Sequence, residues 1–250
     1  MVQGLDIFRK HFKEHQGSYI LIGGVACYLH TEEAGIDFRA TKDLDIVLCA
    51  EALNTEFVSQ FWAFVKAGGY EHIQKSTGEK QFYRFEKPTS NVYPYMLELF
   101  SRTPDAIDIP DDATISPIPV DDDISSLSAI LLDDDYYQCI LKGKSIINDI
   151  PVLGVEYIIP FKAKAWLDMT ERKNNGESID SKKINKHRND AYRMSVLLSP
   201  SKKVELLPSI ANDLRTFVEA QNNATDDLKP LKLGTDKETM LSNLESIYQL

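Results

Sequence analysis

The sequence contains few cysteines and no long apolar run. Among its 250 residues are three cysteines, Cys27, Cys49 and Cys139, which have apolar neighbours and lack the spacing of a metal site. An odd number of cysteines in such positions indicates free thiols in a reducing compartment. No segment approaches the roughly 20 apolar residues of a membrane span, and the first residues do not resemble a signal peptide. We therefore expect a cytoplasmic globular protein without a membrane partner.

Positive charge is also scarce. The 28 Lys and Arg residues face 38 Asp and Glu residues, which gives a formal net charge of -10. This balance argues against broad, nonspecific binding of nucleic acid. The exception is the segment 182–188 (KKINKHR), and the second half also carries Lys162, Lys164, Arg172 and Lys173. Such a group is typical either of a surface that binds phosphate or RNA, or of a solvated helix face.

Two aspartates alternate with apolar residues in the segment 39–48 (RATKDLDIVL). In a strand, successive side chains point to opposite faces. Asp43 and Asp45 are therefore expected on one face, while Leu44 and Ile46 point to the other. Two carboxylates on one face suit a metal ion, although a solvated strand edge gives the same pattern.

The glycine pair Gly23–Gly24 ends a predicted strand (19–24) and directly precedes a predicted helix (25–33). Glycines let the backbone approach phosphate oxygens closely, and a helix N-terminus offers unpaired N–H groups and the positive end of a dipole. Together with the aspartate pair, this turn favours a site for a metal–triphosphate.

A third carboxylate, Glu98, lies between Leu97 and Leu99 in the segment 94–100 (PYMLELF). If that segment is a neighbouring strand, Glu98 stands on the same face as Asp43 and Asp45. Three carboxylates can hold two Mg²⁺ ions about 3.5–4 Å apart, the arrangement used for in-line transfer of nucleotidyl groups. Mg²⁺ needs few protein ligands because substrate oxygens complete its shell.

Gly-Gly, a helix, an Arg-x-Thr-x-Asp-x-Asp strand and a later acidic strand resemble the DNA polymerase beta-type nucleotidyltransferase superfamily. More narrowly, residues 18–198 resemble the AbiEii/AbiGii toxin family, which includes the MenT toxins. In this family a lysine stands at the start of a later helix, where this chain has Lys162 in the segment IIPFKAKAWLDM. The family's Lys-Asp-x-x-Asp motif falls on Asp190, with Arg193 in place of the final aspartate.

The resemblance implies roles for these residues. Lys162 would stabilise charge on the triphosphate, with a surface ion pair as its alternative role. Asp190 would position the nucleotide, position Lys162, or accept the proton of the attacking group. One departure from the superfamily is Val25, which stands where a hydroxyl side chain often contacts the triphosphate.

Three residues beside the aspartate pair are further candidates for nucleotide binding. Arg39 and Thr41 share the expected strand face of Asp43, so they would orient the carboxylates or contact the nucleotide; Arg39 is equally suited to an ion pair with the acidic cluster. Lys42 would neutralise phosphate, or else it is an exposed strand residue.

Hydrophobic periodicity predicts two parts of the chain. An amphipathic helix at the N-terminus buries Leu5, Phe8 and Phe12. A helix over 52–69 carries an apolar stripe formed by Leu53, Phe57, Phe61 and Val65. Strands are expected over 42–48, 81–86 and 94–100, a loop over 102–123, and further strands near 129–132, 136–143 and 151–155. From Val155 to the C-terminus the pattern is helical.

We therefore expect an α/β (α+β) nucleotidyltransferase domain with a mixed sheet over 1–154, and a helical domain over 155–250 that completes the active-site cleft. The expected reaction moves a nucleoside monophosphate from an NTP to an acceptor with the help of Mg²⁺. The family resemblance implies the toxin of a toxin–antitoxin or phage-defence pair, with tRNA as acceptor and an antitoxin protein as partner. A small-molecule nucleotidyltransferase of the antibiotic-modifying kind and a degenerate binding module are the alternatives.

Overall fold

The computed structural model divides the chain into two compact units. The first unit comprises Met1–Val120 and Lys144–Leu153, and the second comprises Asp121–Gly143 and Gly154–Leu250. The residues that the structure describes are 2–39, 41–49, 52, 54–70, 72–75, 81–101, 115–117, 130, 133–225 and 228–250. No helix in these ranges is long and apolar enough to cross a membrane.

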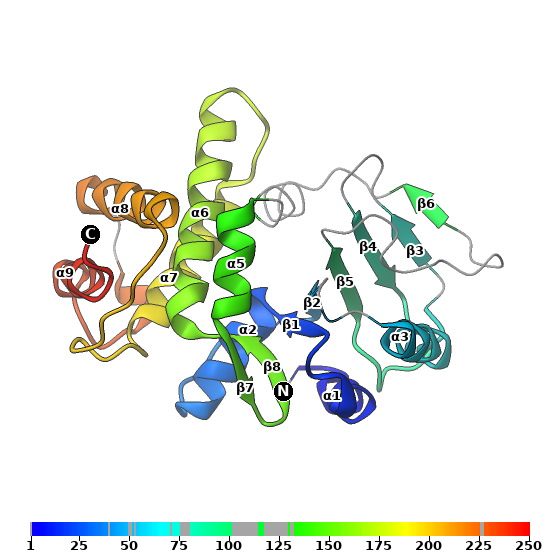
Figure 1. The fold of residues 1–250 in the computed structure, drawn as a ribbon. Coiled ribbons are helices and arrows are strands. Elements are labelled where there is room, and N and C mark those ends of the chain that lie inside the picture. Colours follow the sequence, from blue (N-terminus) through cyan, green and yellow to red (C-terminus); the bar gives the residue numbers. More distant parts are fainter. Residues whose placement is uncertain are drawn as a thin grey trace. The chain divides into compact units, whose positions relative to one another are not determined.

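The first unit is built on an eight-stranded mixed sheet with the strand order β6-β3-β4-β5-β2-β1-β8-β7 (Figure 1). The strands are β1 (Tyr19–Leu21), β2 (Asp43–Leu48), β3 (His72–Lys75), β4 (Gln81–Glu86), β5 (Met96–Ser101), β6 (Ile115–Pro117), β7 (Lys144–Ile147) and β8 (Ile150–Leu153). The central strand β2 pairs antiparallel with β1 and parallel with β5. The prediction of a mixed α/β fold is thereby confirmed.

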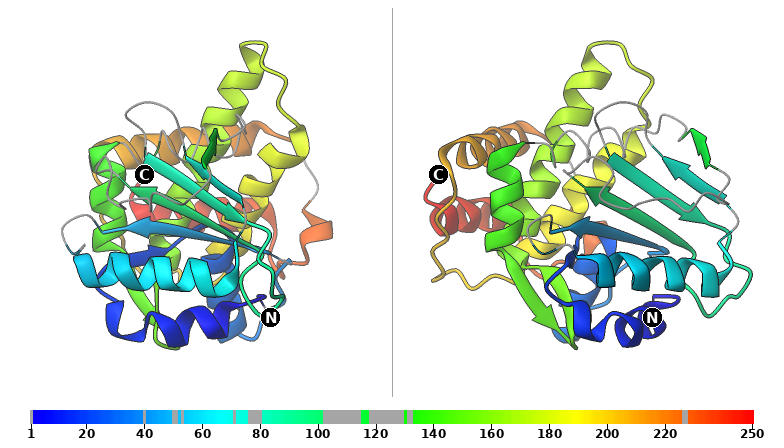
Figure 2. Two further views of the ribbon diagram at one scale, coloured as in Figure 1. Left: turned by 90° about the vertical axis from the view of Figure 1, so that its right-hand side faces the viewer. Right: turned by 45° about the vertical axis from the view of Figure 1, so that its right-hand side comes forward.

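Aromatic residues join two helices to this sheet. Figure 2 shows α1 (Leu5–His11) and α3 (Thr55–Gly68) together along one face of the strands. The ring of Phe8 lies 5.4 Å from that of Tyr19 and 5.6 Å from that of Phe64, both edge-on, the geometry that aromatic pairs prefer. The Asn54 side chain caps α3 by accepting a hydrogen bond from the N–H of Phe57 at 2.8 Å. The predicted burial of the described stripe residues is confirmed, while Leu53 lies outside the described residues.

The second unit is helical. Its helices are α5 (Asp134–Lys142), α6 (Val155–Asn174), α7 (Ser181–Ser195), α8 (Pro208–Asn223) and α9 (Lys237–Tyr248). The longest of them, α6, packs against both α7 and α8, and α8 packs against α9 (Figure 1). The predicted helical pattern after Val155 is thereby confirmed.

A proline inside α6 is accommodated by a tyrosine from α9. Pro160 has no N–H to donate to the carbonyl of Glu156, four residues earlier. The hydroxyl of Tyr248 donates a hydrogen bond to that carbonyl at 2.7 Å. Burial raises the pKa of Tyr248 well above its usual value, so the hydroxyl keeps its proton.

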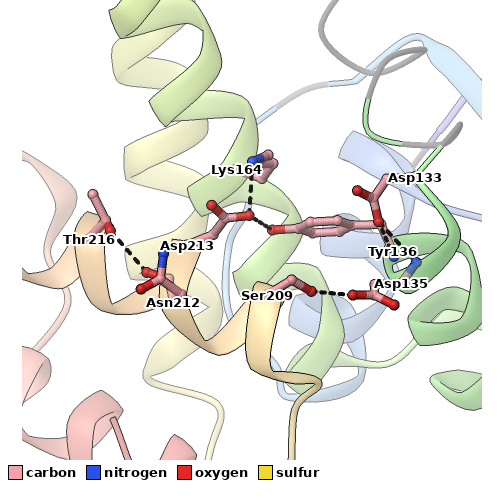
Figure 3. A network of polar contacts seen from close by, with 8 residues as sticks. All are labelled: Asp133, Asp135, Tyr136, Lys164, Ser209, Asn212, Asp213 and Thr216. Atoms are coloured by element: carbon pink, nitrogen blue, oxygen red, sulfur yellow. Dashed lines mark hydrogen bonds and ion pairs between the residues drawn. The ribbon is translucent and has the colours of Figure 1, made fainter.

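A polar network connects α5, α6 and α8 within the second unit (Figure 3). The carboxylate of Asp213 on α8 accepts a hydrogen bond from the Tyr136 hydroxyl and lies against Lys164 Nζ, each at 2.9 Å. The Lys164 ammonium also lies 5.9 Å from the centre of the Tyr136 ring. These contacts link α5, α6 and α8 through one set of side chains.

The prediction of a strand over 136–143 was wrong, because this segment is the helix α5. Asp133 caps it by accepting hydrogen bonds from the N–H groups of Asp135 and Tyr136, and its buried residues Tyr136, Tyr137, Cys139 and Ile140 recur at helical spacing. Aromatic and β-branched residues favour strands by composition, and packing against α6 overrides that preference. Because α5 groups with the later helices, residues 121–143 belong to the second unit, whereas the expected boundary lay at 154.

The secondary structure predicted from the pattern needs further correction. The strand β6 lies within the expected loop 102–123, most of which is outside the described residues. The strands β3 and β7 were not predicted. Of the expected strand at 129–132, only Ile130 is described, and it is helical.

Candidate active site

Three neighbouring strands of the first unit align charged residues in one row. Arg84 on β4 pairs directly with Glu98 on β5 in the antiparallel register. Glu98 in turn pairs with Asp45 on β2 in the parallel register. Paired residues of neighbouring strands project to the same face of a sheet. The expected meeting of Glu98 with the aspartate strand is thus observed for Asp45.

Two of the three residues in this row are buried. Arg84 and Glu98 are 9% and 7% exposed. Arg84 Nε and Nη2 both donate to Oε1 of Glu98, at 2.9 and 2.6 Å. Burial, followed by the charge of Asp45 and a hydrogen bond with it, raises the pKa of Glu98, and the Arg84 guanidinium offsets part of this shift.

The glycine turn lies directly against the carboxylate of Asp45. Gly23 opens α2 (Gly23–Glu33) with φ +64°, and a Cβ on it would lie 1.8 Å from Oδ2 of Asp45. Only glycine therefore fits at this position, on both conformational and steric grounds. The turn from β1 into a helix is confirmed, and it brings the N-terminus of α2 to the carboxylate.

The second glycine lies close to Thr41 and Arg39, which were expected on the strand face of Asp43. A Cβ on Gly24 would lie 2.7 Å from Oγ1 of Thr41 and 3.4 Å from Nη2 of Arg39. Both side chains thus reach the start of α2, although β2 itself begins only at Asp43. The Arg39 guanidinium also lies 5.1 Å from the centre of the Phe38 ring.

The remaining candidates of the first unit lie at the start of β2. Asp43 is half-buried and pairs with Met96 of β5. Because it lies two positions before Asp45 on the same strand, both side chains project to the same face of the sheet. Lys42 is exposed, and its ammonium lies 5.5 Å from the centre of the Tyr95 ring.

The arrangement of carboxylates differs from a compact triad. Over the described part of the chain, no three His, Cys, Asp or Glu side chains form a group suited to a metal ion. What the fold brings together is the pair Asp45 and Glu98, with Asp43 next along the same face. Oxygen donors alone suit Mg²⁺, which takes one or two carboxylates and completes its shell with substrate oxygens and water. The donors present therefore fit this ion.

The two candidates of the second unit form a buried ion pair. Lys162 Nζ lies 3.3 Å from Oδ2 of Asp190, and these residues are 7% and 0% exposed. Arg193, the departure from the family motif, lies 3.9 Å from the other oxygen of Asp190. The alternative of a surface ion pair for Lys162 was wrong. Because α6 begins at Val155, Lys162 also lies about two turns inside the helix and not at its start.

Three other basic residues of the second unit have acidic or polar partners within the same unit. Lys164 pairs with Asp213, Arg172 pairs with Asp168 and Glu177, and Lys173 donates to Ser181. These pairs leave less positive charge for an external phosphate than the sequence indicated.

Sequence reasoning missed Arg84. The sequence did contain a signal for it, because Arg84 is a charged residue between Tyr83 and Phe85 on a predicted strand. That strand pairs with the strand of Glu98. Tyr83 and Phe85 are fully buried on one face of the sheet. Because side chains alternate along a strand, Arg84 projects to the opposite face, where the carboxylates lie.

In comparisons with known proteins, no family model and no curated protein matches this chain.

Proposed function

We propose that the chain is a Mg²⁺-dependent nucleotidyltransferase that moves a nucleoside monophosphate from an NTP to an acceptor hydroxyl or phosphate. The observation that carries the proposal is the in-register pair Asp45–Glu98 with Gly23 packed against Asp45. This pair places acidic oxygens beside a helix N-terminus, and those two features bind metal and phosphate respectively.

The candidate residues of the first unit would each take part in this reaction. Asp43, Asp45 and Glu98 would hold Mg²⁺, which when bound neutralises the triphosphate and polarises the reacting oxygens. Gly23 and Gly24 would let the backbone N–H groups at the start of α2 contact the triphosphate.

The nearby polar residues would orient the nucleotide. Thr41 and Arg39 already reach Gly24, so they are suited to contact the same phosphate groups. Lys42 would add positive charge at the exposed end of β2.

Lys162 and Asp190 complete the proposal. An ammonium held at a fixed position stabilises the charge that develops on a transferring phosphoryl group. The buried contact with Asp190 favours the role in which Asp190 positions Lys162, because it restricts the rotamers of the lysine. On the family resemblance, the acceptor would be tRNA and the biological role that of a bacterial toxin with a cognate antitoxin.

The experiment that tests this function is incubation of the protein with each labelled NTP, Mg²⁺ and total tRNA. We expect label in tRNA together with released pyrophosphate, and loss of both in Asp43→Ala and Asp45→Ala. Asp37→Ala changes an exposed acidic residue before the same strand and should retain activity. Transfer without tRNA to a small acceptor would favour the antibiotic-modifying class, and no transfer to any acceptor would contradict the proposal.

A matched pair of glycine variants tests the phosphate contact at Gly23. Gly23 and Gly35 have similar φ angles, +64° and +69°, but a Cβ on Gly35 would meet nothing within 4 Å. Both alanine variants should lose roughly 1 kcal/mol of stability from the left-handed backbone. Gly23→Ala should lose more than Gly35→Ala, because its Cβ also meets the Asp45 carboxylate. Only Gly23→Ala should also abolish transfer and weaken NTP binding. Equal NTP binding in both variants would contradict the role of this turn.

A further inference from the structure

A buried cation lies beside the carboxylates and has no part in the function described so far. Arg84 is 9% exposed and comes from β4, one strand beyond Glu98. Removing a guanidinium from water is costly unless its hydrogen bonds and charge are matched. The match is supplied by Glu98, which is itself 7% exposed.

The contact has a defined geometry. Both Nε and Nη2 of Arg84 donate to the same oxygen, Oε1 of Glu98. Charge-assisted hydrogen bonds at 2.9 and 2.6 Å from a planar group restrict the rotation of the carboxylate. A lysine in this place would have a single charged nitrogen and would not hold the carboxylate in the same way.

The neighbour on the other side of Glu98 is another carboxylate. Asp45 is its partner in the parallel register, and Gly23 packs against Asp45 from the far side. The row Arg84–Glu98–Asp45 therefore contains two acidic groups and one fixed cation. The guanidinium partly neutralises the pair while its hydrogen bonds hold Glu98 in place.

We propose that Arg84 is a positioning residue that orients Glu98 for a divalent cation shared with Asp45. This inference rests on the proposed function, because it gives the carboxylate row its role in cation binding. Residues that hydrogen-bond to a metal ligand typically change metal affinity by about 10–100-fold when they are replaced. A purely structural ion pair would instead affect the stability of the fold and leave cation affinity unchanged.

The test measures Mn²⁺ binding to the whole protein by calorimetry or electron paramagnetic resonance, without any assay of transfer. We expect Arg84→Gln to weaken Mn²⁺ binding by about 10–100-fold. Arg84→Lys keeps the charge but not the planar pair of donors, so its affinity should be intermediate. Arg172→Gln removes a guanidinium with two carboxylate partners in the second unit and should bind Mn²⁺ like the wild type.

A double variant tests whether Arg84 acts through Glu98. Glu98→Gln alone should weaken Mn²⁺ binding, and adding Arg84→Gln should weaken it little further, because the group that Arg84 positions has already lost its charge. Urea unfolding of each variant reports any loss of the fold. If Arg84→Gln does not fold, the same cycle with Arg84→Lys decides the question.

The outcomes separate the two levels of the proposal. Wild-type affinity in both Arg84 variants, with loss of binding in Glu98→Gln, would overturn the role of Arg84 and leave the proposed function intact. Additive effects in the double variant would also overturn it. A wild-type protein that binds no Mn²⁺, alone or with an NTP, would overturn the metal-dependent function and this inference together.

Discussion

Two lysines that lie two positions apart on α6 have different surroundings. The Lys162 side chain is 9% exposed and pairs with the fully buried Asp190, whereas the Lys164 side chain is 34% exposed and pairs with Asp213. Residues at i and i+2 of a helix point in different directions, which accounts for the difference. Their ion pairs are therefore expected to differ in energy as well as in function.

The first prediction compares the alanine variants of these lysines. Lys162→Ala leaves the Asp190 carboxylate without this partner in the interior, so it should lower the free energy of unfolding by about 3–5 kcal/mol. Lys164→Ala breaks a more exposed pair and should cost about 1 kcal/mol or less. Urea titration gives both values. For transfer of label from NTP, we expect a loss of about 10²–10³ in Lys162→Ala alone. Similar small effects in both variants would contradict the assigned role of Lys162.

The second prediction concerns the thiol of Cys139, a 5% exposed residue on α5. Burial raises its pKa from 9.0 to about 12, although nearby Lys142 lowers it somewhat. In the unfolded chain the thiol ionises near its ordinary value, so the folded state binds the proton more tightly. Its contribution to stability is complete below pH 9 and is lost as the pH rises towards about 12.

The measurement is the difference in unfolding free energy between the wild type and Cys139→Ala. This difference should change by about 1 kcal/mol per pH unit above about pH 9, to the disadvantage of the wild type. Tyrosines that titrate in the same range are present in both proteins, so the part of their contribution that does not depend on Cys139 cancels in the difference. A difference that stays constant with pH would show that the thiol is accessible to water.

At the scale of elements, the helix α6 depends on α9 for one of its hydrogen bonds. Pro160 removes the internal donor for the carbonyl of Glu156, and the Tyr248 hydroxyl supplies another. A proline inside a helix costs about 3 kcal/mol or more, partly through this lost bond. The contact therefore joins the first turns of α6 to the C-terminal helix.

The third prediction is a double-mutant cycle on this contact. Tyr248→Phe should cost about 1–3 kcal/mol, because it leaves a partly buried carbonyl without this donor. In the Pro160→Ala background the N–H of residue 160 can bond to the same carbonyl, so Tyr248→Phe should cost about 1 kcal/mol less. Thermal or urea unfolding of the four proteins gives the coupling. Equal costs in the two backgrounds would mean that the tyrosine stabilises the protein only by packing.

At the scale of the whole molecule, the chain passes between its two units more than once. The hairpin β7–β8 belongs to the first unit, with β8 paired parallel to β1, while α5 before it belongs to the second. A division of the chain at one point therefore separates elements that fold together. The ring of Tyr136 on α5, for example, packs edge-on against Phe161 on α6 at 5.1 Å.

The fourth prediction uses fragments of the chain. The fragment 155–250 lacks α5, so it exposes the apolar face of α6 and should not unfold cooperatively. The fragment 133–250 retains α5 and should show a cooperative thermal transition, because the contacts of Tyr136 with Phe161 and Asp213 are present. Circular dichroism during heating distinguishes them. A cooperative transition in 155–250 would contradict the assignment of α5 to this unit.

The sequence by itself determined the elements whose pattern is local. Alternation of Asp43 and Asp45 with apolar residues identified β2, the glycine pair identified the turn into α2, and the stripe of phenylalanines identified α3. In each case the side-chain periodicity or the need for a left-handed backbone is a property of neighbouring residues. The motif of the candidate site was therefore visible without coordinates.

Only the tertiary structure decided which charged groups meet. The register of β4, β5 and β2 places Arg84, Glu98 and Asp45 in one row, and burial turns Lys162–Asp190 into an interior ion pair. The same is true of α5, where packing against α6 overrides a strand-like composition. Strand register and helix packing depend on residues far apart in the chain, and the energy of an ion pair depends on its burial. A local sequence pattern determines neither the register and packing of the elements nor the burial of an ion pair.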